Sequence, residues 1–440
     1  MTRGWRFALV WLLLSSGLFI IWGAVLERES PGDMVDFELL YEDARCLMQH
    51  RDPYQIAEIQ RAFQAEKPEF RLDSSRSHSL RLAVLLCVNL PTALLLVTPF
   101  AMLPWGAAHL LWMALTALCL ELAACLIWRL AAQWSPRLAL LLVCIWLANC
   151  EVLFAGGNLS GIAISLSVIG VWCLLENRFV PAGILCLALS LASKPQEAGL
   201  VWLGLMLAGG QLRRRAIMSC AVTGALCAAA ILWVSQGAPH WIAELRANLA
   251  ASSAPGAING PAADLSSGMG PHGFINLQSI LVIVRGDPGF FNMASYLICT
   301  PAVLLWAWVT LRSRLSASGI WLALAAISCL TLLPVYHRMY DAKLILLTVP
   351  ACAALWAKRG VAGWVAMLLT TAGFVMTGDI PTAVLAHFTE GLDVSATNFA
   401  GKVLMLLLGR NGALILLSMS ALYLWVFVGR AWGREKVLQA

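Results

Sequence analysis

Apolar segments long enough to cross a lipid bilayer recur along the whole chain, and this feature limits the fold more than any other. A span needs roughly 17–25 apolar residues to cross a hydrocarbon core about 30 Å thick. Hydrophobic residues make up 60% of the 440 residues and charged residues only 12%, against about 25% charged in an average soluble domain. The sequence therefore predicts an all-α, polytopic helical membrane protein that forms a single integral domain over residues 1–440.

Basic connections alternate with acidic ones, and this alternation predicts the orientation. The basic, acid-poor connections are 2–6, 129–137, 178, 213–215, 312–314, 358–359 and 430–436. The connections at 27–81, 236–290, 335–343 and 378–402 hold all ten aspartates. Because Lys and Arg mark the cytoplasmic side, we expect an inner-membrane protein with both termini in the cytoplasm. The acidic side would then face the exterior.

The orientation implies about twelve spans if the segment 82–103 does not cross. That segment is interrupted by Asn89, Pro91 and Pro99, and a full crossing there would put the 129–137 connection on the wrong side. We interpret it as re-entrant or as lying in the outer interface. The predicted spans are 5–26, 107–130, 138–154, 159–176, 180–193, 196–210, 216–235, 291–311, 316–334, 342–357, 361–377 and 412–429.

A charged stretch follows the first span, inside a first outer loop predicted for residues 27–106. Its apolar residues recur at helical spacing and are Phe37, Leu40, Tyr41, Ala44, Leu47 and Met48. The other face carries Glu38, Glu42, Asp43, Arg45 and Gln49. We expect an interfacial helix, with Asp36 as a residue suited to its N-cap. Anchoring helices are usually rich in Lys and Arg, and this one is acidic, so a cap and a functional carboxylate both remain open for Asp36.

Further polar sites interrupt the apolar segments on the same outer side. A turn at 154–158 ends in Asn158, and Pro195 breaks a hydrophobic hairpin beside Lys194 and Glu197. Charges facing lipid are costly, so that pair is either a lysine bonded to its neighbour or part of a site. The turn at 334–343 carries more polar residues than a plain connection needs, which favours a functional role.

The motifs of several enzyme classes are missing from the sequence. It contains no G-x-x-x-x-G-K-[ST], no G-x-G-x-x-G opening a helix, no H-E-x-x-H and no G-x-S-x-G. The net charge of +6 is divided among short loops, which does not indicate a nucleic-acid partner. Carboxylate, His, Lys and Arg side chains at an outward-facing lipid interface suit group transfer from a lipid-phosphate donor.

The outer motifs resemble those of a known family. Asp36-Phe37-x-x-x-Tyr41 with Ala44, followed by Asp52-Pro53-Tyr54, is similar to the first outer loop of the glycosyltransferase C superfamily, and closest to glycosyltransferase family 87. The likeness continues in Leu90-Pro91-Thr92, Pro104-Trp105, Gly156-Gly157-Asn158, Ala182-Gly183, Ser193-Lys194-Pro195, Asn276 to Ser279 with Arg285, and His337 to Asp341. The sequence departs from the family pattern at Gly157, where glutamine is common, and at Thr92, where a second proline is usual.

This resemblance implies an inverting glycosyltransferase that moves a hexose, with mannose expected, from a polyprenyl-phosphate donor to a lipid or glycan acceptor. It implies Asp36 as the general base, with no cofactor, no nucleotide and no metal. The residues expected to bind the donor are Asn158, Lys194, Asn276, Arg285, His337 and Arg338. The residues expected to bind the acceptor or support the site are Tyr41, Arg45, Tyr54, Glu197, Asp341 and Lys343. Membrane lipids are further expected partners, and the outer loop at 236–290 is expected to lie over the site.

Other functions remain open from the sequence. A secondary transporter would place ionisable residues near the bilayer midplane, often on broken helices within a repeat, and no repeat is visible here. A ligase of undecaprenyl-linked glycans, or another lipid-phosphate transferase, would also use outward-facing polar sites. A membrane scaffold without catalysis would need none of them.

Overall fold

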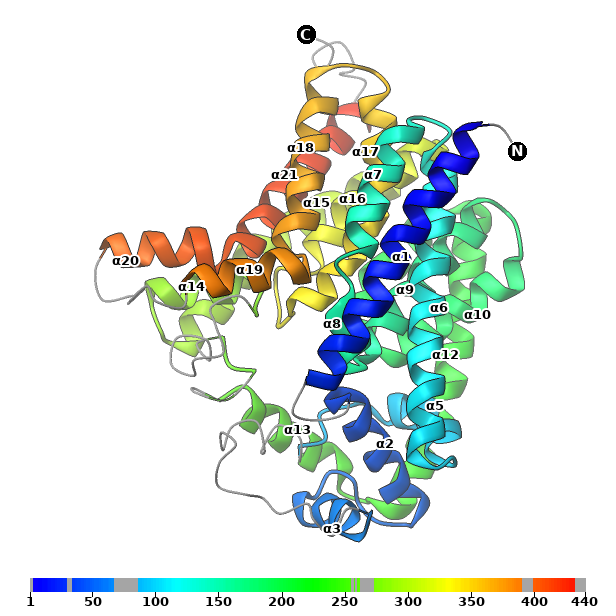
Figure 1. The fold of residues 1–440 in the computed structure, drawn as a ribbon, viewed down its shortest axis with the longest axis vertical. Coiled ribbons are helices and arrows are strands. Elements are labelled where there is room, and N and C mark those ends of the chain that lie inside the picture. Colours follow the sequence, from blue (N-terminus) through cyan, green and yellow to red (C-terminus); the bar gives the residue numbers. More distant parts are fainter. Residues whose placement is uncertain are drawn as a thin grey trace.

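The computed structural model describes residues 3–29, 34–66, 86–254, 257, 259–261, 273–389 and 399–431. Every regular element in these ranges is a helix, and the one strand-type pairing found there is an isolated bridge between Phe274 and Arg338. The start of α1 (Arg3–Glu29) and the end of α21 (Asn411–Ala431) lie toward the same end of an elongated helical bundle (Figure 1). The prediction of an all-α, polytopic membrane protein is confirmed.

Seven spans in the described chain are long and apolar enough to cross a bilayer. They are formed by α1 (Arg3–Glu29), α6 (Trp105–Ala131), α7 with α8 (Pro136–Leu147 and Glu151–Gly156), α12 (Gly210–Gly237), α15 (Pro288–Arg312), η2 with α17 (Met339–Thr348 and Val349–Trp356) and α21 (Asn411–Ala431). An eighth arises if α18 (Val361–Met376) and α19 (Asp379–Thr389), bent by 67°, count as one. Eight of the twelve predicted spans thus correspond to these helices.

The other four predicted spans form shorter helices. These are α9 (Leu159–Leu175), α10 (Val180–Ser193), α11 (Pro195–Leu207) and α16 (Ala317–Leu330). They contain 13 to 17 residues, and at about 1.5 Å per residue they reach roughly 20–26 Å, less than the ~30 Å hydrocarbon core. Helix length therefore supports seven or eight of the twelve predicted spans as complete crossings.

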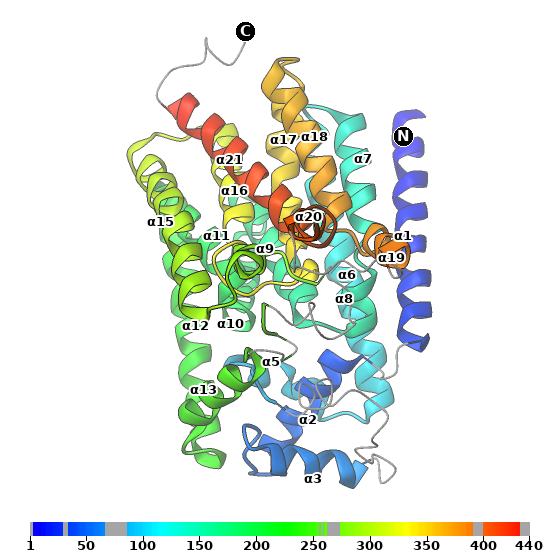
Figure 2. The same ribbon diagram turned by 90° about the vertical axis from the view of Figure 1, so that its left-hand side faces the viewer.

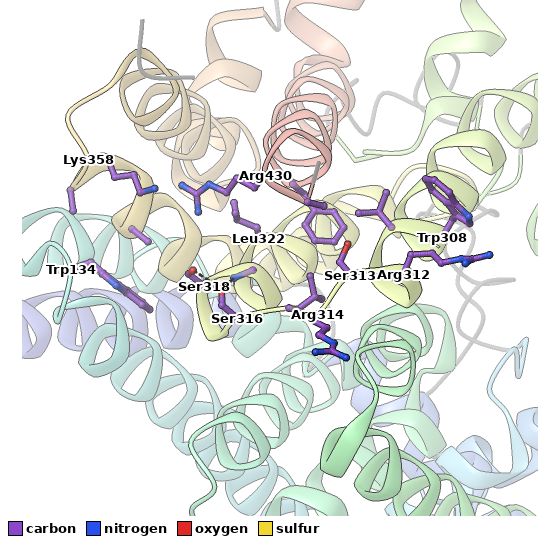
Figure 3. Close-up of a pocket in the computed structure, with 17 residues that line it drawn as sticks. Trp134, Trp308, Arg312, Ser313, Arg314, Ser316, Ser318, Leu322, Lys358 and Arg430 are labelled. Carbon is purple, nitrogen blue, oxygen red and sulfur yellow. Dashed lines mark hydrogen bonds between the residues drawn. The ribbon is translucent and has the colours of Figure 1, made fainter. Parts of the chain in front are cut away.

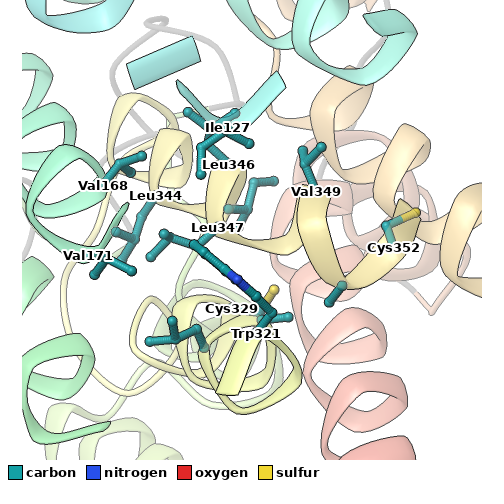
Figure 4. Packing of buried hydrophobic residues seen from close by; sticks show 14 of the residues in the cluster. Ile127, Val168, Val171, Trp321, Cys329, Leu344, Leu346, Leu347, Val349 and Cys352 are labelled. Carbon is teal, nitrogen blue, oxygen red and sulfur yellow. The ribbon is translucent and has the colours of Figure 1, made fainter. Parts of the chain in front are cut away.

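The centre of the bundle is an apolar core around η2. This ten-residue 3-10 helix is buried at Leu344, Leu346 and Leu347 and packs against α9, α16 and α17. Figure 4 shows these leucines beside Trp321 and Val349. Runs of 3-10 helix longer than three or four residues are uncommon. The run places Asp341 and Lys343 at the start of a buried element, directly after a polar turn.

A helical head covers the end of the bundle opposite the termini (Figure 2). It contains α2 (Val35–Met48), α3 (Ile56–Glu66), α5 (Pro91–Ala101) and α13 (Trp241–Ser252). The Asn248 side-chain amide donates to the carbonyl oxygens of Tyr54 and Cys87, each at 3.0 Å. The outer loop at 236–290 is thereby joined to the first outer loop.

Helix α2 forms where it was predicted, but its polar face is not exposed as the amphipathic pattern had suggested. Its apolar face is buried, with the Phe37 ring stacked on Trp112 at 4.3 Å between centroids. Its acidic face is buried too, at Glu38, Glu42 and Asp43. Helices α3, α5 and α8 pack against it. Periodicity identifies an apolar face, but it does not reveal that later segments also cover the polar one.

The segment 82–103 forms one short helix in its described part. Helix α5 has 11 residues with Pro99 inside it, so it is about 16 Å long at ~1.5 Å per residue. It packs against α2, α6, α10 and α12. This length agrees with the prediction that the segment does not cross the membrane; residues 82–85 lie outside the described ranges.

Three described helices remain. They are α14 (Leu277–Val284), α20 (Phe399–Leu404) and the short π-helix η3 (Met405–Gly409). Figure 1 shows α14, α19 and α20 projecting from the bundle between its two ends.

Candidate active site

Asp36 lies in the first turn of α2 and does not cap it. The cap position is Met34, whose left-handed φ of 49° starts the helix without any side-chain hydrogen bond. The Asp36 carboxylate turns instead toward α9, where its Oδ2 accepts a hydrogen bond of 2.8 Å from the Asn158 amide nitrogen. The capping interpretation of Asp36 is therefore wrong.

Asn158 holds Asp36 in a defined direction. Its Oδ1 accepts from the backbone N–H of Ser160 at 2.9 Å, so the side chain caps α9. The same oxygen accepts from the Lys194 ammonium at 3.1 Å. Since both donors need an oxygen, the amide nitrogen must face the opposite way, toward Asp36. One amide thus connects the carboxylate to the ammonium.

Gly157, just before α9, allows α2 to pack close enough for Asp36 to reach Asn158. Its φ of 63° is in the left-handed region, and a Cβ added there would lie 2.7 Å from the Phe37 Cβ. No side chain fits at that distance, which gives a physical reason for glycine where the resembled family commonly has glutamine. The Gly157 carbonyl accepts from the Trp112 indole N–H at 2.8 Å, which fixes the turn further.

Lys194 occupies the break between α10 and α11. Its Nζ lies 3.3 Å from Glu197 Oε1 and 3.7 Å from Asp341 Oδ1, and it donates to the Ser160 hydroxyl. Burial alone lowers the pKa of Lys194, but the two carboxylates raise it above its ordinary value. The lysine therefore keeps its charge although only 17% of its side chain is exposed.

Ser160 joins the acidic residues, and the sequence analysis did not single it out. Its Oγ lies 2.7 Å from Glu197 Oε1 and 2.6 Å from Asp341 Oδ1. A hydroxyl has one proton and cannot donate to two carboxylates at once. One of the two carboxyl groups, Glu197 or Asp341, must therefore carry a proton of its own, so that the pair shares one proton besides that of the Ser160 hydroxyl. The signal for Ser160 was its position two residues after Asn158 at the start of a helix.

The turn before η2 supplies Arg338 and His337. The Arg338 backbone N–H donates to Asp341 Oδ2 at 2.9 Å, and its Nε donates to the Tyr336 hydroxyl at 2.7 Å. Both Arg338 and Tyr336 also donate to Asn259 Oδ1, at 3.2 and 2.8 Å. Asn259 comes from the loop at 236–290, so this loop contacts the turn at 334–343.

His337 is buried, with its Nδ1 3.2 Å from the Val335 carbonyl oxygen. A carbonyl can only accept, so Nδ1 carries the proton and Nε2 is the acceptor nitrogen. Burial lowers the pKa of His337, which favours this neutral ring. Nε2 has no hydrogen-bond partner within the described ranges.

Lys343 belongs to a second buried group of charges. Its Nζ donates to the Thr377 carbonyl oxygen at 2.8 Å and lies 3.3 Å from Asp379 Oδ1. Asp379 Oδ2 accepts from the Val152 backbone N–H at 2.8 Å. The neighbouring Glu151 is fully buried. We name Lys343, Asp379 and Glu151 the inner charge cluster; the structure does not bring Lys343 into the network around Asp36.

The other residues expected at the site make local contacts. Asn276 caps α14 by accepting from the Ser279 N–H at 3.1 Å, and Arg285 is exposed beside Asp287 at 3.7 Å. In the helical head, the hydroxyls of Tyr41 and Tyr54 donate to backbone carbonyls, and Arg45 donates to Tyr41 at 3.0 Å. The described contacts do not link these five residues to Asp36.

Arg410 is a further buried cation that the sequence analysis missed. Its Nε donates to the Ser279 carbonyl oxygen at 3.2 Å. Its guanidinium lies 5.9 Å from the Phe274 ring centroid, and that of Arg338 lies 5.2 Å from the same centroid. Two cations thus lie close to one aromatic ring. A lone arginine between two apolar helices is costly in a membrane, which was the available signal.

Within the described ranges, His, Cys, Asp and Glu do not gather in groups of three or more that could hold a metal ion. We name Asp36, Asn158, Ser160, Lys194, Glu197 and Asp341 the Asp36 network. It combines one partly exposed carboxylate, a linking amide and an ammonium between acidic partners. Such a set can accept a proton at one end and stabilise negative charge at the other.

Part of the Asp36 network lies in a range that matches a known family. Residues 88–284 match the model of glycosyltransferase family 87. The matched range includes Asn158, Ser160, Lys194 and Glu197, and it ends before Asp341 and begins after Asp36. The resemblance seen in the motifs is confirmed over that range. No curated protein and no solved structure matches the chain.

Proposed function

We propose that this chain, whose residues 88–284 match the model of glycosyltransferase family 87, is a glycosyltransferase that moves a hexose from a polyprenyl-phosphate donor to a lipid or glycan hydroxyl. Mannose is the proposed sugar, and the outer face of the inner membrane is the proposed site of transfer. The observation that carries the proposal is the amide of Asn158, which joins the Asp36 carboxylate to the Lys194 ammonium.

Asp36 is the proposed general base. Its hydrogen bond to Asn158 engages Oδ2, and the side chain is only partly buried, so Oδ1 can accept the proton of an acceptor hydroxyl. Asn158 donates to the carboxylate and thereby fixes its direction.

Lys194 and Arg338 are the proposed binding groups for the donor phosphate. Part of the Lys194 side chain is exposed, so a phosphate oxygen can reach its ammonium by replacing one of the present acceptors. Arg338 and Arg410 both lie close to the Phe274 ring and add positive charge next to the turn. Asn276 and Arg285 are proposed to act only indirectly, through the position of α14.

The transfer step follows from these roles. The acceptor oxygen attacks the anomeric carbon and forms the new glycosidic bond while its proton passes to Asp36. The bond from the anomeric carbon to the phosphate oxygen breaks, and the polyprenyl phosphate leaves with the bonding electrons. Attack from the side opposite the phosphate inverts the anomeric configuration, and the cations stabilise the charge that develops on the phosphate.

The test is transfer by the purified full-length protein in liposomes with radiolabelled polyprenyl-phosphate-mannose and a panel of lipid and glycan acceptors. We expect labelled product from this donor and none from a nucleotide-activated mannose. NMR of the product should show the inverted anomer. Product from the nucleotide sugar alone would contradict the proposed donor, and retention of configuration would contradict the single-step mechanism.

A second donor with the same lipid and a different hexose tests the sugar separately. Faster transfer of glucose or galactose than of mannose would change the proposed sugar without affecting the proposed donor class. The matched control for each donor is the Asp36→Asn protein, prepared in the same liposomes.

A further inference from the structure

A cavity of about 710 Å³ lies at the end of the bundle opposite the helical head. It is formed by the last turn of α15, the connection to α16, the last turns of α17 and α21, and Trp134 after α6. It shares no residue with the Asp36 network. The transfer reaction proposed above therefore leaves this cavity without a role.

Cations gather around this cavity from separate parts of the chain. Arg312 ends α15, Arg314 lies in the α15–α16 connection, Lys358 follows α17, and Arg430 lies in the last turn of α21. Figure 3 shows Lys358 and Arg430 on one side of the cavity and Arg312 and Arg314 on the other. None of the described residues that line it is acidic. A recess lined by charges of one sign attracts ions of the opposite sign.

Neutral donors accompany these cations. The hydroxyls of Ser313, Ser316 and Ser318 line the same cavity. Hydroxyl and guanidinium groups together suit the oxygens of a phosphate, because guanidinium donates to two oxygens at once and hydroxyls reach the third.

The remaining lining is apolar and lies beside tryptophans. Leu315, Leu322 and Phe427 form part of the wall, and the indoles of Trp134 and Trp308 border it. Tryptophan is enriched where the bilayer meets water. A free inorganic anion would gain nothing from apolar walls, whereas a lipid brings a charged head and an apolar tail together.

We propose that this cavity binds the phosphate headgroup of an anionic membrane lipid. Arg312, Arg314, Lys358 and Arg430 surround the phosphate, and the first part of the acyl chains lies against Leu315 and Leu322. Basic recesses between membrane helices bind anionic headgroups by the same combination of charge and depth.

The proposal can be tested with full-length protein purified in a neutral detergent. Phosphatidylglycerol is titrated in, with phosphatidylcholine of the same acyl chains and inorganic phosphate as separate arms, and bound lipid is measured by native mass spectrometry. We expect saturable binding of phosphatidylglycerol only. Equal binding of phosphatidylcholine would mean an apolar groove, and suppression of lipid binding by millimolar inorganic phosphate alone would mean a free-anion site; either overturns the proposal.

A charge-matched pair of variants locates the binding. Arg312→Gln with Arg314→Gln should weaken phosphatidylglycerol binding roughly thirtyfold, since each basic residue near a lipid surface contributes about a factor of five. Arg178→Gln with Arg214→Gln removes the same charge from connections that do not line the cavity and should change binding by less than threefold. Equal losses in the two proteins would show general charge attraction and overturn the site.

Photo-crosslinking uses the unaltered protein, so its result does not depend on whether a variant folds. Phosphatidylglycerol with a diazirine near the start of its acyl chain should label residues within 308–322. Labelling confined to other helices would overturn the proposal.

Discussion

Lys194 and Lys343 are both buried lysines beside acidic residues, yet their surroundings differ. Lys194 contacts Glu197, Asp341 and the Asn158 amide that leads to Asp36, and 17% of its side chain is exposed. Lys343 contacts Asp379 and a backbone carbonyl, and only 3% of its side chain is exposed. One lysine therefore connects to a carboxylate that a substrate can reach, and the other is enclosed.

The difference teaches that a buried lysine and its acids are not by themselves a site. The Lys343–Asp379 pair joins the start of η2 to the start of α19, and Asp379 also holds the backbone at Val152. This is a structural link between three segments. The Asp36 network has a similar charge content but opens toward Asp36. The following predictions separate the two groups by whether transfer or stability changes.

The largest expected effect is on transfer in Asp36→Asn. The amide cannot take the acceptor's proton, so the rate should fall by the roughly 10²–10⁴-fold typical of a lost general base. Because Asp36 does not cap α2, stability should change little. Initial rates and thermal melting of the same preparation measure both. A normally folded Asp36→Asn enzyme with wild-type rates would remove Asp36 from the mechanism.

The next effect is on stability in Lys343→Met. It leaves Asp379 buried without its cation, and breaking a buried pair typically costs about 3–5 kcal/mol of the free energy of unfolding. Transfer per folded molecule should stay within about twofold of wild type, because sites that share no partner influence each other by less than about 0.5 kcal/mol. Denaturant unfolding in detergent and active-site titration measure the two quantities.

The double variant Lys343→Met with Asp379→Leu is the matched control for this prediction. Removing both charges avoids an unpaired buried ion, so part of the lost stability should return. A stable but inactive Lys343→Met protein would place the inner charge cluster in the reaction, and the cluster would then not be purely structural.

Lys194→Met should lose donor binding by about 1.5–3 kcal/mol, the usual contribution of a charge-assisted hydrogen bond. The KM for the donor should rise more than kcat falls if the lysine meets the phosphate. A fall in kcat at unchanged KM would instead assign Lys194 to positioning Asn158. A loss of melting temperature with unchanged kinetics would make this lysine structural, like Lys343.

Gly157→Ala should disturb the same network through the backbone. A non-glycine residue in the left-handed region costs roughly 1–2 kcal/mol, and the added Cβ would press on Phe37, next to Asp36. Both melting temperature and rate should fall. Gly224→Ala, where no atom lies within 4 Å of the added Cβ, should leave the rate unchanged and should not lower the melting temperature, because alanine is favoured over glycine inside a helix. Equal behaviour of the two variants would show that α2 can move without consequence.

The smallest effect is expected for Glu197→Gln. Asp341 already accepts from both the Arg338 N–H and Ser160, so the shared proton belongs on Glu197, and glutamine keeps a donor there. The change should be below about 1 kcal/mol in stability and in transition-state binding, less than a typical hydrogen bond. Asp341→Asn should cost clearly more. The opposite order would place the proton on Asp341.

The sequence by itself determined the class of the protein and most of its helices. Length and apolarity of each segment decide whether it can lie in a membrane, and these are local properties. Turn and break residues such as Asn158 and Pro195 also act locally, and the structure places both at helix starts. The polar outer positions could therefore be identified, including five of the six residues in the Asp36 network.

Only the tertiary structure decided which of these positions meet. The bonds from Asp36 to Asn158 and from Ser160 to Asp341 join residues 122 and 181 positions apart, and no periodicity contains that pairing. The burial of the acidic face of α2, the enclosure of Lys343 and the basic cavity also depend on which helices pack together. Packing sums many contacts between distant segments, whereas a sequence pattern reports only neighbours along the chain.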